Sequence, residues 1–338
     1  MKQVLRGRKA FAVYSIVATL AFLPCGARAQ SCQTSGELDD ATRTAITTAG
    51  QRYFDMAAKG DVASMRQNSI PTLASDFSAL ETKVKDRQPD LAGAQSMVKA
   101  LFLLDASGSA PIPHAEFLCG VFGKNGQTPG SAALYLDNLP AGMYAAVLLN
   151  AASSKGKMMF SEILQQVGTD WKLGGLYITS ALAAGHDSDW FLARAREYTA
   201  KGQLHNAWLF YLQARSLISP LPFMDTLATD KLYEESHSLQ PADMPAGGKT
   251  ADLAAGTTTY KLTAVFAQGV GNDLDLIVKY QSADASNSNL AYQDNIAVMK
   301  AFVTKYPEVK DAFTGIVARA VDAGGHDYGT LLAMKDIK

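Results

Sequence analysis

The sequence predicts a mixed α+β fold: an N-terminal α+β domain, a central helical hairpin and a small C-terminal ββαββ domain. Apolar residues between Leu38 and about Met97 recur at spacings of three and four, which is typical of helices. Beyond Pro111, apolar and β-branched stretches alternate with turn residues, which is typical of antiparallel strands. From Asp187 to about Leu239 the helical spacing returns. Helices followed by strands favour an α+β rather than an α/β arrangement.

The first 29 residues have the pattern of a cleavable secretory signal. Four basic residues precede an apolar run, Ala10–Leu23, which is shorter than the roughly 20 residues of a membrane span. Ala27 and Ala29 supply the small residues of a cleavage site, so we expect cleavage after Ala29. The alternative is a lipoprotein anchored at Cys25, although bulky residues precede that cysteine. Cleavage after Ala29 predicts a periplasmic or secreted protein, whereas the alternative predicts one anchored to a membrane.

Charge and length narrow the possible functions of the remaining chain. The whole chain has 31 basic and 32 acidic residues, and five of the basic ones lie in the signal. The remainder is therefore acidic and lacks a basic cluster, which disfavours binding to nucleic acid. No later segment is apolar for long enough to span a membrane. The length predicts two or three domains of a soluble protein.

Cys32 and Cys119 are the two cysteines that would remain after cleavage. Two cysteines in an oxidising compartment usually pair, so we predict a disulfide between them. Cys119 lies in an apolar run from Phe117 to Phe122 that is typical of a strand. The bond would tie the new N-terminus to this strand. The alternative is one buried thiol and one exposed thiol.

Residues 30–180 are expected to form the first domain. Its strands are expected at Ala132–Leu136, Met143–Leu149, Lys157–Val167 and Trp171–Ile178. This order of elements, and the ending Trp171-Lys172-Leu173-Gly174-Gly175-Leu176-Tyr177, resemble the cone-like fold of nuclear transport factor two and ketosteroid isomerase. The resemblance covers roughly residues 36–180, and it implies a curved sheet that helices close on one side around a pocket. Because that fold serves isomerases, dehydratases and plain binding modules, it implies no particular activity.

Residues 181–240 are expected to form a helical pair. The first helix begins at the capping residue Asp187 and ends at Gly202, and the second ends before Pro220. The pair resembles a single tetratricopeptide-type repeat through Tyr198, Gly202, Ala207, Tyr211, Ala214 and Pro220. Its large aromatic residues would form either a packing surface or a partner-binding surface: Trp190, Tyr198, Trp208 and Tyr211.

Residues 241–256, rich in proline and glycine, are expected to be a linker, and residues 257–338 a C-terminal domain. Its elements are expected as strands Thr259–Phe266 and Leu274–Tyr280, a helix from about Asn289 to Pro307, and strands Gly315–Val321 and Thr330–Met334. The phrases Ala184-Gly185-His186-Asp187 and Gly271-Asn272-Asp273-Leu274-Asp275-Leu276 resemble those of a group of exported bacterial proteins. That resemblance implies no activity.

Motifs of catalysis and metal binding are absent from the sequence. It has no Gly-x-Ser-x-Gly elbow, His-Glu-x-x-His pair, P-loop or Cys-x-x-Cys. The neighbours His186-Asp187 and His326-Asp327 are interpreted as loop and cap residues, and Asp275 as a solvent-facing strand residue rather than a calcium ligand. We therefore assign no catalytic, cofactor-binding or metal-binding residue, and expect no cofactor.

Two functions remain open. The first is an exported, non-enzymatic module that binds a small apolar ligand or an envelope protein. The alternative is a cone-fold isomerase, hydro-lyase or hydrolase acting on a small apolar substrate, which would need a carboxylate and proton donors converging on one pocket. Strand positions make Glu116, Glu162, Tyr135 and Tyr144 the candidates, but the sequence does not assign a base among them.

Overall fold

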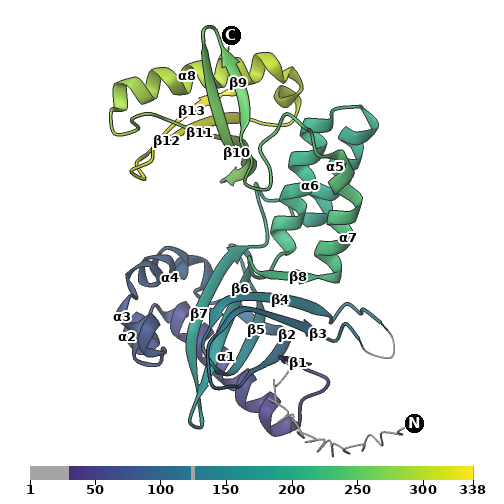
Figure 1. The fold of residues 1–338 in the computed structure, drawn as a ribbon, viewed down its shortest axis with the longest axis vertical. Helices are drawn as coiled ribbons and strands as arrows, with labels where there is room; N and C mark the ends of the chain where they lie inside the picture. Colours follow the sequence, from purple (N-terminus) through teal and green to yellow (C-terminus); the bar gives the residue numbers. More distant parts are fainter. Residues whose placement is uncertain (1–29, 123–125, 338) are drawn as a thin grey trace, which may run out of the picture.

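The structure is a computed structural model that describes residues 30–122 and 126–337. It confirms a mixed α+β protein, in which runs of helices and runs of strands follow one another along the chain (Figure 1). The expected signal and the alternative anchor at Cys25 lie outside the described residues. Among the helices of the described ranges, none is long and apolar enough to cross a membrane.

A five-stranded antiparallel sheet forms the centre of the N-terminal part, with the strand order β1-β2-β5-β6-β7. The strands are β1 (Ser31–Thr34), β2 (Gln95–Ala106), β5 (Gly142–Ser153), β6 (Gly156–Val167) and β7 (Asp170–Ser180). Tight turns join β5 to β6 and β6 to β7, at the places where the sequence has its turn residues. Because these turns are short, strands that follow one another in the sequence also pair with one another in the sheet.

Four helices cover one face of this sheet (Figure 1). They are α1 (Asp40–Lys59), α2 (Val62–Gln67), α3 (Pro71–Ser75) and α4 (Ser78–Leu91). Helix α1 begins after Asp39, whose carboxylate accepts a hydrogen bond from the backbone N–H of Thr42. Its apolar side packs on the sheet, where the rings of Phe54 and Phe160 meet edge to face with centroids 5.3 Å apart. Apolar side chains fill the space between helices and sheet.

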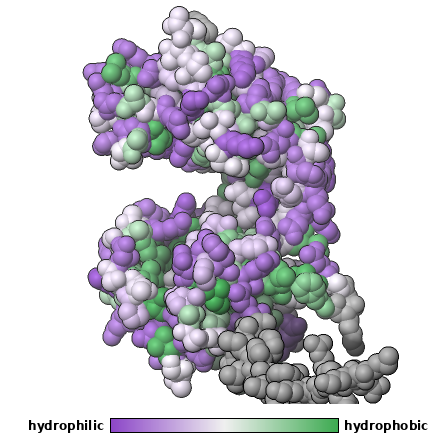
Figure 2. Space-filling view, in the orientation of Figure 1, coloured by the Kyte–Doolittle hydropathy of each residue, from purple (hydrophilic) through white to green (hydrophobic). Residues whose placement is uncertain are grey.

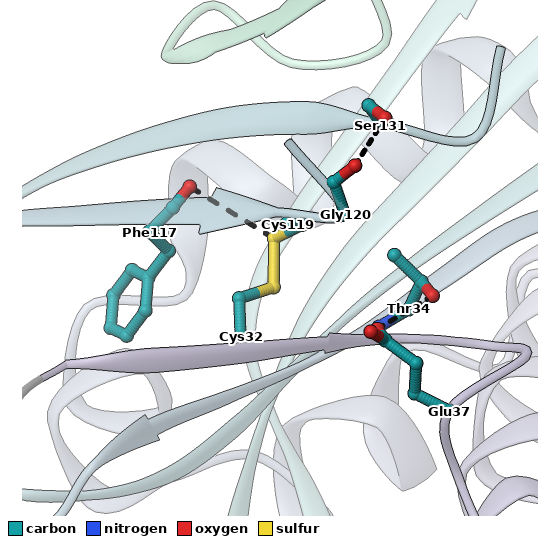
Figure 3. The surroundings of a disulfide bond; sticks show 7 residues. All are labelled: Cys32, Thr34, Glu37, Phe117, Cys119, Gly120 and Ser131. Atoms are coloured by element: carbon teal, nitrogen blue, oxygen red, sulfur yellow. Dashed lines mark hydrogen bonds between the residues drawn. A yellow bond between two sulfur atoms is a disulfide. The ribbon is translucent and has the colours of Figure 1, made fainter. Parts of the chain in front are cut away.

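A small sheet of three strands packs on the other face. It contains β3 (Ile112–Cys119), β4 (Ala132–Leu139) and β8 (Met224–Thr226). Phe117 and Leu134 from this sheet share a core with Phe102 and Leu148 of the larger one. The structure also joins Cys32 of β1 to Cys119 at the end of β3 in a disulfide, as predicted (Figure 3). The bond therefore fastens the two sheets together near the start of the described chain.

The expected helical segment up to about Met97 is wrong at its end. Helix α4 stops at Leu91, and β2 begins at Gln95. Gly93, with φ of 73°, makes the left-handed turn between them. Strand β2 carries the continuous apolar run Leu101–Leu104, because both of its faces are covered there. Such a run does not show the period of two that marks a half-buried strand.

The central segment contains three helices rather than two. Helices α5 (Ser188–Ala200) and α6 (Leu204–Ile218) lie where they are predicted, and α7 (Leu227–Ser236) follows β8. Asp187 caps α5 by accepting a hydrogen bond from the backbone N–H of Trp190. Helix α7 begins with a capping box of Thr226 and Thr229. Its few buried residues give only a weak periodic signal in the sequence, so the third helix was not predicted.

The C-terminal part is a second five-stranded sheet, with the order β13-β12-β11-β10-β9 and one helix, α8, packed on it. Its elements are β9 (Ala251–Ala255), β10 (Thr258–Val270), β11 (Asp273–Gln281), α8 (Ser288–Lys305), β12 (Gly315–Val321) and β13 (Asp327–Ala333). Strand β9 lies within the expected linker 241–256, which is a correction to that boundary. Its small residues lack the β-branched signal of a strand. Short 3-10 turns lie at His237–Leu239, Pro307–Asp311 and Met334–Asp336.

Helices α5 and α6 share one continuous core with the C-terminal sheet. Phe210 of α6 packs between Tyr198 of α5 and Phe313, which precedes β12. The three helices thus connect the N-terminal and C-terminal parts along one side of the molecule, and an open hollow lies between these parts on the other side (Figures 1 and 2).

Candidate functional site

A cleft of about 600 Å³ lies where the larger N-terminal sheet meets the ends of α5 and α6. Its lining comes from β2, β5, β6, the chain after β7, α5 and α6: Gln95, Ser96, Met97, Lys99, Asn150, Ala151, Ala152, Lys157, Met158, Met159, Ala181, Asp187, Ser188, Asp189, Leu217 and Ile218. Clefts of this volume are the usual size for small ligands.

Three adjacent strands form the floor of the cleft. Met97 pairs with Asn150, and Asn150 pairs with Met159, so these three side chains lie in one row on one face of the sheet. Met159 is buried, whereas Met97 is 68% exposed. Apolar side chains that line a cleft, together with a few polar groups, are what small-ligand sites usually offer. The unbranched thioether of methionine adapts to ligands of different shape.

The opposite wall is formed by the first turn of α5 and the last turn of α6. Ser188 of α5 donates a hydrogen bond of 2.9 Å to the carbonyl of Ala214, which holds the two helices together at this point. Leu217 and Ile218 add apolar surface, and Asp189 lies beside them. Lys99 and Lys157 on the floor form no ion pair within the described ranges. The cleft therefore combines an apolar centre with charges of both signs.

The titratable side chains of the lining are Lys99, Lys157, Asp187 and Asp189. The lining contains no His, Cys, Tyr or Glu. One of its two carboxylates, Asp187, is already engaged as the cap of α5. Nucleophilic or acid–base catalysis needs a reactive group with a second group that orients or activates it.

A second notable group is Glu162 of β6, which is fully buried on the helix-covered side of the sheet. Neither carboxyl oxygen has a hydrogen-bond partner. Burial raises the pKa of Glu162 well above its usual range, and the charge of Arg52 opposes this only in part. The cross-strand neighbours Val147 and Leu176 are apolar. Burial therefore favours the neutral form of this carboxyl.

The four residues considered for a cone-fold enzyme do not converge. Glu116 and Tyr135 are cross-strand partners on β3 and β4, and both are exposed. Tyr144 lies in the core between the two sheets, where its hydroxyl donates to the carbonyl of Pro140. Glu162 lies on the opposite face of the larger sheet. The structure therefore assembles no active site from these residues.

The neighbouring His and Asp residues do not act on each other. His186 stacks on Trp190 with ring centroids 3.7 Å apart, while Asp187 caps α5. Nδ1 of His326 lies 2.9 Å from Oδ2 of Asp322, whereas Asp327 accepts a hydrogen bond from Arg319. Across the described ranges, no group of three His, Cys, Asp or Glu residues is placed to hold a metal ion.

Asp275 corrects one sequence interpretation, because it is only 4% exposed. It lies on β11, the central strand of the C-terminal sheet, between β10 and β12. The pKa of its carboxyl is raised, chiefly by burial. The turn that precedes β11 resembles a solvent-exposed loop in sequence, but the residues of β11 are buried from Leu274 onward.

The four aromatic residues of the helical segment face two directions. Tyr198 is buried against the C-terminal part, and its hydroxyl donates to the carbonyl of Asp311. Tyr211 is buried toward α7, where its hydroxyl donates to Glu235. Trp208 is 7% exposed, and Trp190 is half-buried.

Sequence reasoning missed the cleft because Met97 was assigned to a helix. The signal that would have found it is Gly93, which marks the end of α4 and makes the next residues a strand. Comparison with models of protein families, with curated proteins and with solved structures finds no match to this chain.

Proposed function

We propose that the protein is an exported, non-enzymatic binding module of the cell envelope, and that it binds apolar groups in the cleft floored by Met97. The observation that carries this proposal is the exposure of Met97 at a cleft that Met158, Met159, Leu217 and Ile218 also line. The disulfide supports the oxidising compartment that export implies. The acidic balance of the chain beyond residue 29 argues against nucleic acid as the partner.

The finer architecture is part of the same proposal. The N-terminal part is a cone-like domain, and α5 with α6 is a single tetratricopeptide-like pair. Support for the first comes from four helices packed on one face of a long-stranded sheet. In a cone-fold enzyme the pocket lies between helices and sheet. Here Tyr53, Phe54 and Phe160 fill that space, which favours binding elsewhere.

The alternative, an isomerase, hydro-lyase or hydrolase of the cone fold, is favoured by one observation, the burial of the Glu162 carboxyl, which raises its pKa. A carboxylic acid kept neutral in an apolar site is a known catalytic device. However, the side chain is enclosed by packed residues, and it has no second polar group within hydrogen-bond distance. The binding function therefore has the stronger geometric support.

Titration with the neutral fluorescent probe N-phenyl-1-naphthylamine tests the proposal. Saturable binding is expected, and Met97→Glu should weaken it by about tenfold or more, which corresponds to roughly 1.4 kcal/mol. The control is Val270→Glu, an equally drastic change at a residue that is 52% exposed at the far end of β10. Equal binding to both variants, or no saturable binding to the parent, would refute the proposed site.

A further inference from the structure

One edge of the larger N-terminal sheet is open where it borders the cleft. Strand β1 pairs only with the second half of β2, from Phe102 to Asp105. The first half, Gln95–Leu101, pairs with β5 on its inner side. Within the described residues, no backbone hydrogen bond reaches its outer side. This half of β2 therefore presents unpaired N–H and C=O groups, which are the binding groups for another extended chain.

The open edge and the cleft are one continuous surface. Gln95, Ser96, Met97 and Lys99 belong to the edge and also line the cleft. Side chains of a strand point alternately to the two faces of a sheet. A chain laid along this edge would therefore direct every second side chain toward the face that carries Met97 and Met159. It would gain backbone hydrogen bonds and apolar contacts together.

We propose that the cleft binds an extended peptide segment of another envelope protein, which adds to the sheet as a strand along Gln95–Leu101 and places an apolar side chain against Met97. This inference rests on the proposed function and names its partner. Strand addition of this kind obtains affinity from main-chain hydrogen bonds and specificity from pockets for alternate side chains.

The edge is unsuited to a second copy of the same chain. Lys99 lies on it, and the pairing of β2 with β5 shifts register between Val98 and Ala100. A lysine on an edge strand opposes the joining of two identical sheets, and the bulge at Lys99 interrupts regular pairing of any added strand. In a symmetric pair of copies, the two Lys99 ammonium groups would also approach each other, which is unfavourable. A foreign peptide brings no second lysine to this position, and it can pair with the part of the edge on one side of the bulge.

Phage-displayed random dodecapeptides, selected on the parent protein and counter-selected on Met97→Glu, supply the probe. The best sequence is then synthesised in three forms: unmodified, N-methylated on its odd-numbered amides, and N-methylated on its even-numbered amides. Because the N–H groups of a strand point alternately to its two sides, only one methylated form loses donors to β2. That form should bind at least about tenfold more weakly than the unmodified peptide, as expected for two or three lost hydrogen bonds. The other methylated form should bind nearly as tightly as the unmodified peptide.

The same peptide should displace N-phenyl-1-naphthylamine from the parent and should bind the Val270→Glu control normally. If both methylated forms bind equally well or equally poorly, the ligand is not an added strand and the inference is wrong. It is also wrong if selection enriches no peptide while the naphthylamine probe still binds, and in either case the cleft keeps its proposed function. If neither probe binds, the proposed function itself fails.

Discussion

Gly50 of α1 lies against the buried carboxyl of Glu162. A Cβ placed at Gly50 would stand 2.9 Å from Glu162 Oε2 and 2.8 Å from Val147 Cγ1, closer than such atoms approach without movement. The missing side chain makes room for the carboxyl between helix and sheet. The helix therefore contains a residue that weakens helices in general, at a point where the packing requires it.

Replacement of Glu162 by methionine should stabilise the protein at pH 7. The carboxyl has no hydrogen-bond partner, and an unsatisfied buried polar group costs about 1–3 kcal/mol. An unbranched apolar side chain of similar length removes that cost. Urea unfolding should show an increase of this size in the free energy of unfolding. Destabilisation would mean that the carboxyl has a partner in solution.

The stability contributed by Glu162 should depend on pH. In the unfolded chain a glutamate ionises near pH 4.3, whereas burial raises the pKa of Glu162 in the folded protein. Above pH 4.3 the folded state therefore holds a proton that the unfolded state has lost. The unfolding free energy consequently falls as pH rises, by at most about 1.4 kcal/mol per pH unit, until the raised pKa is reached.

Glu162→Gln removes this titration, so its advantage over the parent should grow between pH 4 and pH 7. Unfolding midpoints measured across that range check the expectation. Glu116→Gln, at an exposed position on β3, is the matched control and should follow the parent. A constant difference between Glu162→Gln and the parent would contradict a raised pKa.

Gly50→Ala should destabilise the protein although alanine favours helices. The helix gains about 1 kcal/mol from the substitution, but the new methyl group meets Val147 and Glu162 in a packed core. Overpacking of this kind costs typically 1–3 kcal/mol, so we expect a net loss of up to about 2 kcal/mol. In a Val147→Ala background the loss should shrink, because one of the two obstructing side chains is then smaller.

The sequence predicts strands well where turn residues separate them. Strands β4 to β7 were found because Gly168-Thr169-Asp170 and similar turns mark their ends. The disulfide was predicted from the compartment and the cysteine count alone. The strands follow from turn residues close to them in the sequence, and the disulfide follows from the compartment and the number of cysteines. A single sequence contains all of this information.

Features that depend on distant packing were not predictable. Asp275 follows a turn and looks exposed in sequence, but its carboxyl packs against Gly315, its cross-strand partner on β12, and is buried. The cleft at Met97 requires the ends of α5 and α6 to approach β2, and these segments are about 90 residues apart or more. Nothing in the local pattern of Gln95–Lys99 indicates that helices from later in the chain lie over it.

The export hypothesis predicts the N-terminus of the mature protein. The basic start, the apolar run and Ala27-Arg28-Ala29 are expected to direct cleavage after Ala29. Intact mass spectrometry of the exported protein should therefore find a chain that begins at Gln30. An acylated chain that begins at Cys25 would show instead that the protein is anchored to a membrane.

Removal of the disulfide should cost about 2–5 kcal/mol of stability. The bond joins residues 87 positions apart, and a long closed loop restricts the unfolded chain strongly. The double variant Cys32→Ala, Cys119→Ala should unfold at correspondingly lower urea concentration. As a control, reductant should lower the midpoint of the parent toward that of the variant and leave the variant unchanged. A parent insensitive to reductant after denaturation would contradict the bond.

Trp208→Ala tests whether the aromatic surface of the helical segment is a core or a partner site. Helix α6 is buried on all sides over Asn206–Tyr211, which is typical of a helix enclosed by other elements. Trp208 itself is 7% exposed. Its removal should therefore cost about 3–5 kcal/mol, the range for a large aromatic side chain taken from a core.

The matched control for Trp208→Ala is Leu204→Ala, at a position on the same helix that is 43% exposed. Because that side chain already contacts water, its removal should change stability by no more than about 0.5 kcal/mol. Urea unfolding of both variants beside the parent separates the two roles. If Trp208→Ala unfolds at the same midpoint as Leu204→Ala, the indole does not support the core, and α6 becomes a surface to test for partner binding.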